Sequence, residues 1–108
     1  MIDYDGRRFR KSRDATGTVA VYHQNGDVVW AEFAGGEVRR GHLTGIREPD
    51  GTLHLGYTIV LAAGEVVCGR TVNTPELTTD GRVLLREVWE RYGPHAATGV
   101  SYLEEVAE

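Results

Sequence analysis

Three charged residues occur beside large apolar side chains on segments with strand-like alternation. Glu32 follows Trp30 by two positions, Glu87 precedes Trp89 by two, and Arg70 has an apolar residue two positions away on either side. Because side chains two positions apart share a face of a strand, a face that buries the apolar residues also buries the charge. Buried charges are costly unless they pair. The trio is therefore either an ion-pair network or a site for a polar ligand group or acid/base chemistry.

Three aromatic residues on separate segments, Trp30, Tyr57 and Trp89, have flat rings with a polar N–H or O–H group at one end. Each alone is explained by core packing with a satisfied N–H or O–H group. Together, and beside charges, they favour a role in lining a ligand site. Arg70 is the cation best placed to bridge the two glutamates. The sequence therefore predicts one interior pocket lined by Trp30, Glu32, Tyr57, Arg70, Glu87 and Trp89.

Other site chemistries have little support. Cys68 is the only cysteine, so no intrachain disulfide can form, and we expect a buried packing thiol. The four histidines lie on different segments without metal-ligand spacing. The chain has no phosphate-binding loop, dinucleotide fingerprint, nucleophile elbow or zinc signature. We expect no cofactor and no metal site, and the sequence assigns no catalytic residue.

The elements that position these residues are expected to be strands. Alternating apolar residues and turn signals mark strands at 6–13, 18–23, 27–34, 37–47, 52–61, 66–73, 82–92 and 99–106. Asn25-Gly26 and Gly35-Gly36 suit tight hairpin loops, which need positive φ, and a further turn is expected at 14–17. Leu and Glu in 82–92 also favour helix, but the Asp80-Gly81 turn before it favours a strand.

Short connections imply that consecutive strands pair with each other. A meander of eight strands avoids open edges by closing on itself. We therefore predict an all-β protein. Residues 1–108 would form a single domain, an antiparallel up-and-down β-barrel of about eight strands.

Composition and charge limit the kinds of partner and the location that we expect for the chain. The 108 residues carry a net charge of −4, which disfavours sequence-independent binding of nucleic acid. No apolar run is long enough to span a membrane, and the N-terminus lacks the apolar run of a signal peptide. A single cysteine fits a reducing compartment, so we expect a cytoplasmic location. Apolar residues on both faces of strands, such as Val28 and Val29, predict a homodimer.

Several stretches together resemble one group of proteins. They are residues 23–36, Gly64-Glu65, Thr74-Pro75-Glu76, Asp80-Gly81-Arg82, Glu87-Val88-Trp89 and residues 101–105. They resemble small bacterial proteins with an avidin-like β-barrel, commonly labelled N-acetylglutamate synthase. Such an acetyltransferase needs a pyrophosphate-binding loop at a helix N-terminus, and the sequence has neither. No motif aligns with avidin's biotin contacts, so the resemblance implies a fold and no activity.

Three functions stay open at this point. The first is a small-molecule-binding barrel, and the second is a small barrel cyclase or isomerase that moves a proton with Glu32 or Glu87. The third is an interaction module with a solid core. An open aromatic lumen would favour the first two, and a raised carboxylate pKa in that lumen would favour the enzyme. A solid core with an exposed apolar patch would favour the module.

Overall fold

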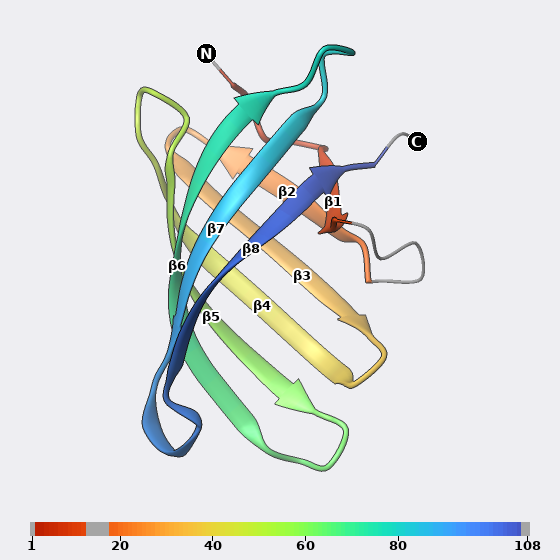
Figure 1. Cartoon of the computed structure of the whole chain (residues 1–108), viewed down its shortest axis with the longest axis vertical. Helices are drawn as coiled ribbons and strands as arrows, with labels where there is room; N and C mark the ends of the chain where they lie inside the picture. Colours follow the sequence, from red (N-terminus) through yellow and green to blue (C-terminus); the bar gives the residue numbers. More distant parts are fainter. Residues whose placement is uncertain (1, 13–17, 107–108) are drawn as a thin grey trace.

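The computed structural model describes residues 2–12 and 18–106, and these form a closed barrel (Figure 1). Its elements are β1 (Arg8–Lys11), β2 (Ala20–Asn25), β3 (Val28–Gly35), β4 (Val38–Arg47), β5 (Leu53–Leu61), β6 (Val66–Leu77), β7 (Val83–Arg91), the 3₁₀ turn η1 (Gly93–His95) and β8 (Ala97–Glu105). Every strand pairs antiparallel with the next along the chain, and β1 also pairs with β8. The predicted up-and-down barrel is therefore confirmed.

The hairpin loops begin one residue later than the sequence suggested. Asn25 pairs with Val28, so the loop of the β2–β3 hairpin is residues 26–27, with Gly26 at φ 63°. Gly35 likewise pairs with Val38, which makes residues 36–37 the next loop. Residues 83–91 form a strand and not a helix. The turn predicted at 14–17 lies outside the described residues.

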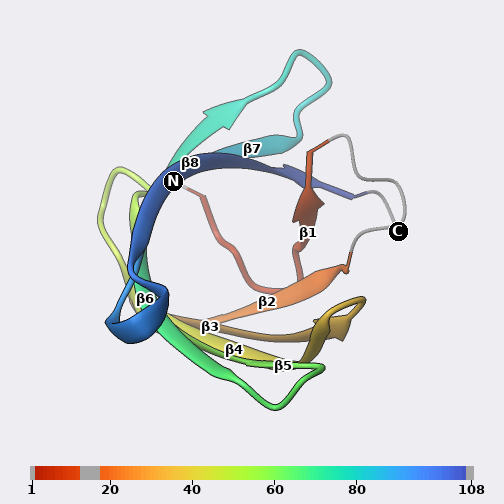
Figure 2. The same ribbon diagram turned by 60° about the horizontal axis from the view of Figure 1, so that its bottom comes forward.

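An aromatic cluster fills one end of the barrel. Phe9 and Tyr22 pack edge to face with ring centroids 4.9 Å apart, and Tyr4 from the N-terminal segment packs against both. The Tyr4 hydroxyl donates a 2.7 Å hydrogen bond to the carbonyl oxygen of Gly51, between β4 and β5. Figure 2 shows the N-terminal segment crossing the ring of strands. We call this the closed end of the barrel.

Burial keeps two phenols of the closed end uncharged. It raises the pKa of Tyr4 to about 12, and it raises the pKa of Tyr22 as well. Both phenols therefore stay protonated, and Tyr4 remains a hydrogen-bond donor. The fully buried aliphatic residues in the same cluster are Val29, Ala31, Leu53, Val83 and Leu85. Within the described part of the chain, no helix is long and apolar enough to cross a membrane.

Candidate functional site

The barrel interior beyond the closed end contains a cavity of about 360 Å³. It extends toward the β3–β4, β5–β6 and β7–β8 connections. Its lining is aromatic and aliphatic with a few polar groups: Phe9, Arg10, Lys11, Thr18, Ala20, Tyr22, Phe33, Val38, Leu43, Tyr57, Ile59, Thr71, Glu87, Trp89, Arg91, Ser101 and Leu103. Inward and outward side chains alternate along each strand, so most of these residues come from inward-facing positions, while Arg10 and Thr18 lie at the rim.

Three aromatic side chains of the cavity each lie over a glycine of the neighbouring strand. The directly opposed pairs are Phe33–Gly41, Tyr57–Gly69 and Trp89–Gly99. A Cβ atom at any of these glycines would collide with the ring opposite it. The rings therefore lie against the barrel wall, where only glycine permits such close approach. This arrangement leaves room at the centre of the lumen.

Glu87 carries the acidic group of the cavity. Asn73, which is completely buried and directly opposite on β6, donates a 3.2 Å hydrogen bond from its side-chain amide to Oε2 of Glu87. Burial raises the pKa of the Glu87 carboxyl, while the Asn73 hydrogen bond and the charge of Lys11 act against that rise. Burial is the larger effect, so the carboxylate is incompletely compensated inside the protein.

Two hydroxyl groups lie near Glu87. Ser101 is directly opposite Glu87 on β8, and its Oγ accepts a 3.1 Å hydrogen bond from the indole N–H of Trp89. Thr71 is opposite Trp89 on β6 and is 7% exposed. Its buried Oγ1 has no hydrogen-bond partner within residues 2–12 and 18–106. Buried polar groups in proteins are nearly always paired, so Thr71 has unused hydrogen-bonding capacity next to the cavity.

The outer part of the cavity is basic. Arg91, two positions beyond Trp89 on β7, places its guanidinium carbon 5.5 Å from the Trp89 ring centroid, within cation–π range. Lys11 also lines the cavity and is exposed. Arg10 forms a 3.5 Å ion pair with Glu104. The cavity is thus polarised, with a carboxylate at the inner end and cations toward solvent.

The family of the chain follows from its sequence as well as its topology. A family model described as avidin-like protein matches residues 2–106. The chain belongs to the avidin-like protein family. Members of this family commonly bind small ligands and often form oligomers. No curated protein matches the chain in sequence.

The avidin-like barrel brings together only half of the residues predicted to share a pocket. Tyr57, Glu87 and Trp89 line the cavity. Trp30 does not, and its ring lies on the outer face, stacked on His23 with the centroids 5.6 Å apart. The placement of Trp30 in the interior was therefore wrong.

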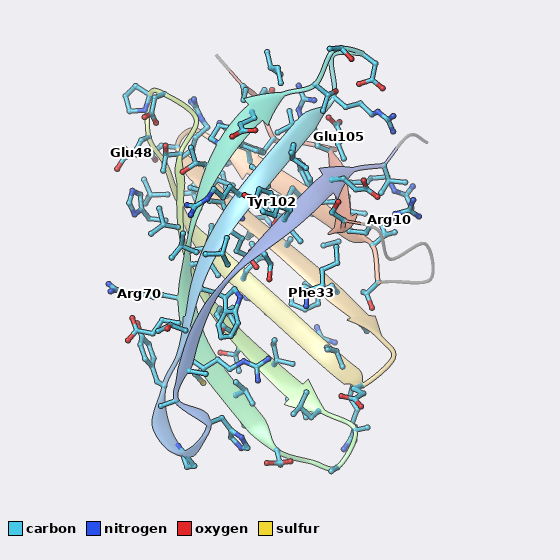
Figure 3. The ribbon with its side chains drawn as sticks, viewed as in Figure 1. Arg10, Phe33, Glu48, Arg70, Tyr102 and Glu105 are labelled. Carbon is cyan, nitrogen blue, oxygen red and sulfur yellow. The ribbon has the colours of Figure 1, made fainter. Side chains whose placement is uncertain are left out.

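The predicted bridge between the charges of the trio does not form. Glu32 is on the outer face, with its side chain 60% exposed and 3.2 Å from Arg40. Arg70 is also outside, 67% exposed and 3.1 Å from Glu90. Figure 3 shows the Arg70 side chain extending away from the barrel wall. Glu32 and Arg70 each have an exposed partner. Of the three charged residues, only Glu87 lies in the interior.

The error lies in which face of a strand points inward. Trp30 and Glu32 share a face as predicted, but the opposite face of β3 is also apolar, and its fully buried Val29 and Ala31 form the interior. The inward face of β6 was also misassigned: Cys68 was expected to be buried, but it is exposed and its sulfur lies 3.8 Å from the hydroxyl of Thr58. When both faces of a strand carry apolar residues, alternation alone cannot select the inner one.

Sequence reasoning missed several groups of the avidin-like cavity. They are Lys11, Phe33, Thr71, Asn73 and Arg91. For Phe33 a signal was present, since Gly41 inside a strand indicates a close approach by another group. The positions of Thr71 and Asn73 relative to Glu87 depend on the pairing of β6 with β7, which no local pattern reveals.

Proposed function

We propose that this avidin-like barrel binds a small molecule with a flat aromatic body in its cavity. The observation that supports this most is the aromatic-walled cavity of about 360 Å³. Ligand pockets typically have about 300–1,000 Å³ and a mainly apolar lining with a few placed polar groups. Phe33, Tyr57 and Trp89 offer the ring surfaces. Such a hollow interior is a reason to prefer ligand binding over an interaction module with a solid core.

The charges of the cavity narrow the ligand class. Lys11 and Arg91 line the cavity, and neither forms an ion pair within the described residues. Cations at the entrance of a cleft attract anions and raise their local concentration. An aromatic carboxylic acid fits this arrangement, with its ring against Trp89 and its carboxylate near Arg91.

The two tryptophans allow a controlled test, because one lines the cavity and the other lies outside it. Substituted benzoates should change the tryptophan fluorescence of the wild type and of Trp30→Leu. The change should be lost in Trp89→Leu, which removes the cavity reporter and part of the ring surface. If no aromatic acid alters the fluorescence of Trp30→Leu, the proposed function is wrong.

A second candidate function is proton transfer by Glu87. It is favoured by the position of Glu87 in the cavity, where burial raises the pKa of its carboxyl in the direction that suits a general acid or base. Glu32 is no longer a candidate, because it lies on the outer face. An enzyme of this type should catalyse deuterium exchange at an acidic C–H of a bound aromatic ketone. The absence of exchange above the rate seen with Glu87→Gln would argue for binding alone.

We also propose that residues 1–108 act as one domain that forms a homodimer in the cytoplasm. Outward side chains stand directly opposite one another from β3 to β8, in the order Val28, Ile46, His54, Val72, Val88 and Val100. We call this the outer apolar row. Val28, Ile46, Val88 and Val100 are all exposed, and a second barrel would cover them. The exposed thiol of Cys68 is compatible with a reducing compartment.

A further inference from the structure

We propose that the inner end of the cavity binds a cationic nitrogen group of the ligand, an ammonium or an amidinium. The ligand is then a small amphoteric aromatic compound, with a carboxylate toward solvent and a basic nitrogen beside Glu87. This inference rests on the proposed binding of an aromatic acid and specifies the other end of that molecule. It is carried by the hydrogen-bonding groups around Glu87.

The inner end presents the carboxylate of Glu87, and two side-chain N–H groups beside it are already used. Asn73 gives its amide N–H to Glu87, and Trp89 gives its indole N–H to Ser101. The carboxylate of Glu87 accepts only, when ionised, and the hydroxyl of Thr71 has no partner among the described residues. A ligand group that donates hydrogen bonds therefore fits the carboxylate of Glu87. An ammonium group has three N–H donors.

The charge balance favours a cationic donor over a neutral one. Glu87 is the only carboxylate among the described residues that line the cavity. Lys11, whose charge lowers the pKa of this carboxyl, is exposed, so water weakens its attraction. A cation bound directly to the carboxylate would compensate the buried charge, and charge-assisted hydrogen bonds are roughly twice as strong as neutral ones.

The order of side chains along β7 sets the orientation of the ligand. Leu85 belongs to the closed end, Glu87 follows it into the cavity, Trp89 presents its ring, and Arg91 lies beyond. Glu87 and Arg91 are four residues apart, which is about 13 Å along a strand. Flexible Arg91 and Lys11 side chains can reach back over the ring. A benzene ring with charged groups at opposite ends can therefore contact both charges.

A matched pair of probes tests the inference. 4-(Aminomethyl)benzoate and 4-(hydroxymethyl)benzoate have nearly the same shape and differ in the charge at one end. Binding is followed through the NMR signal of the Trp89 indole N–H, with the Trp30 indole as an internal reference outside the cavity. The wild type should bind the amine at least about tenfold more tightly than the alcohol, as expected for hydrogen bonds to a charged group.

Two variants assign the preference to a residue. In Glu87→Gln the amine and the alcohol should bind about equally, since the amide keeps the shape but not the charge. In Glu32→Gln, an outer-face glutamate, the preference should be unchanged. Loss of the preference in Glu32→Gln, or its retention in Glu87→Gln, would overturn the assignment to Glu87.

The outcomes separate this inference from the proposed function. If the alcohol shifts the Trp89 signal and the amine binds no more tightly, the cationic inner group is wrong while aromatic-acid binding stands. If neither probe shifts that signal, both are wrong. The wild-type comparison alone gives this decision, so the inference remains falsifiable even if Glu87→Gln fails to fold.

Discussion

Asn73 holds Glu87 by a 3.2 Å hydrogen bond from the directly opposite position on the neighbouring strand. This contact orients the carboxylate but adds no positive charge. Glu87 is thus fixed in position and remains electrostatically costly when it is ionised. The same residue accordingly limits the stability of the empty barrel and supplies its strongest attraction for a cation.

Glu87→Gln should remove a pH dependence of stability. A carboxyl whose pKa is raised on folding stabilises the native state below its unfolded pKa, and this contribution is lost as pH rises through the folded pKa. The free energy of unfolding of Glu87→Gln at neutral pH should therefore equal or exceed that of the wild type. Urea unfolding from acidic to neutral pH measures this difference.

The exposed Glu32→Gln is the control for that experiment, and its stability should follow the wild-type pH profile. A neutral-pH loss of several kcal/mol in Glu87→Gln would mean that the carboxylate is fully compensated in the folded protein.

Gly99→Ala should destabilise the barrel because the new Cβ would collide with the Trp89 ring. We expect a loss of about 1–3 kcal/mol, typical of overpacking, together with a changed Trp89 fluorescence spectrum. Gly56→Ala is the matched control, since Gly56 is also inside a strand and its Cβ would meet no atom closer than 4.0 Å. Equal stabilities of the two variants in urea would contradict the close packing of Trp89.

Tyr4→Phe should lower the free energy of unfolding by about 1–3 kcal/mol, since it leaves the buried carbonyl of Gly51 without its 2.7 Å hydrogen bond. Tyr92→Phe removes an exposed hydroxyl and should have little effect. Thermal or urea unfolding compares the two variants. A Tyr4→Phe protein as stable as Tyr92→Phe would show that the N-terminal segment contributes little to the closed end.

Val88→Lys should dissociate the proposed homodimer, because it places a charge between Val72 and Val100 in the outer apolar row. In a symmetric interface the same change occurs on both subunits, which strengthens the effect. Sedimentation velocity should detect monomers for this variant and dimers for the wild type. Val66→Lys, at a more exposed position outside the row, should remain dimeric. A monomeric wild type at high concentration would exclude the homodimer.

The sequence was sufficient to predict the barrel, since alternation and turn residues together defined all the strands. It also placed Glu87 beside Trp89 correctly, because in β7 the face that includes Val83 and Leu85 is the interior. It failed for Trp30, since both faces of β3 are apolar. The contact between Asn73 and Glu87 could not be predicted, because it depends on strand register and not on local sequence.

The three aromatic–glycine pairs determine the width of the lumen, and they do not include the residue that determines its charge. Each pair spans only two adjacent strands, so exchanging the ring and its glycine for two residues of intermediate size would reshape the lumen locally. The carboxylate at the inner end would be unaffected. In this barrel, the width of the lumen and the charge at its inner end therefore depend on different residues, and one can change while the other is kept.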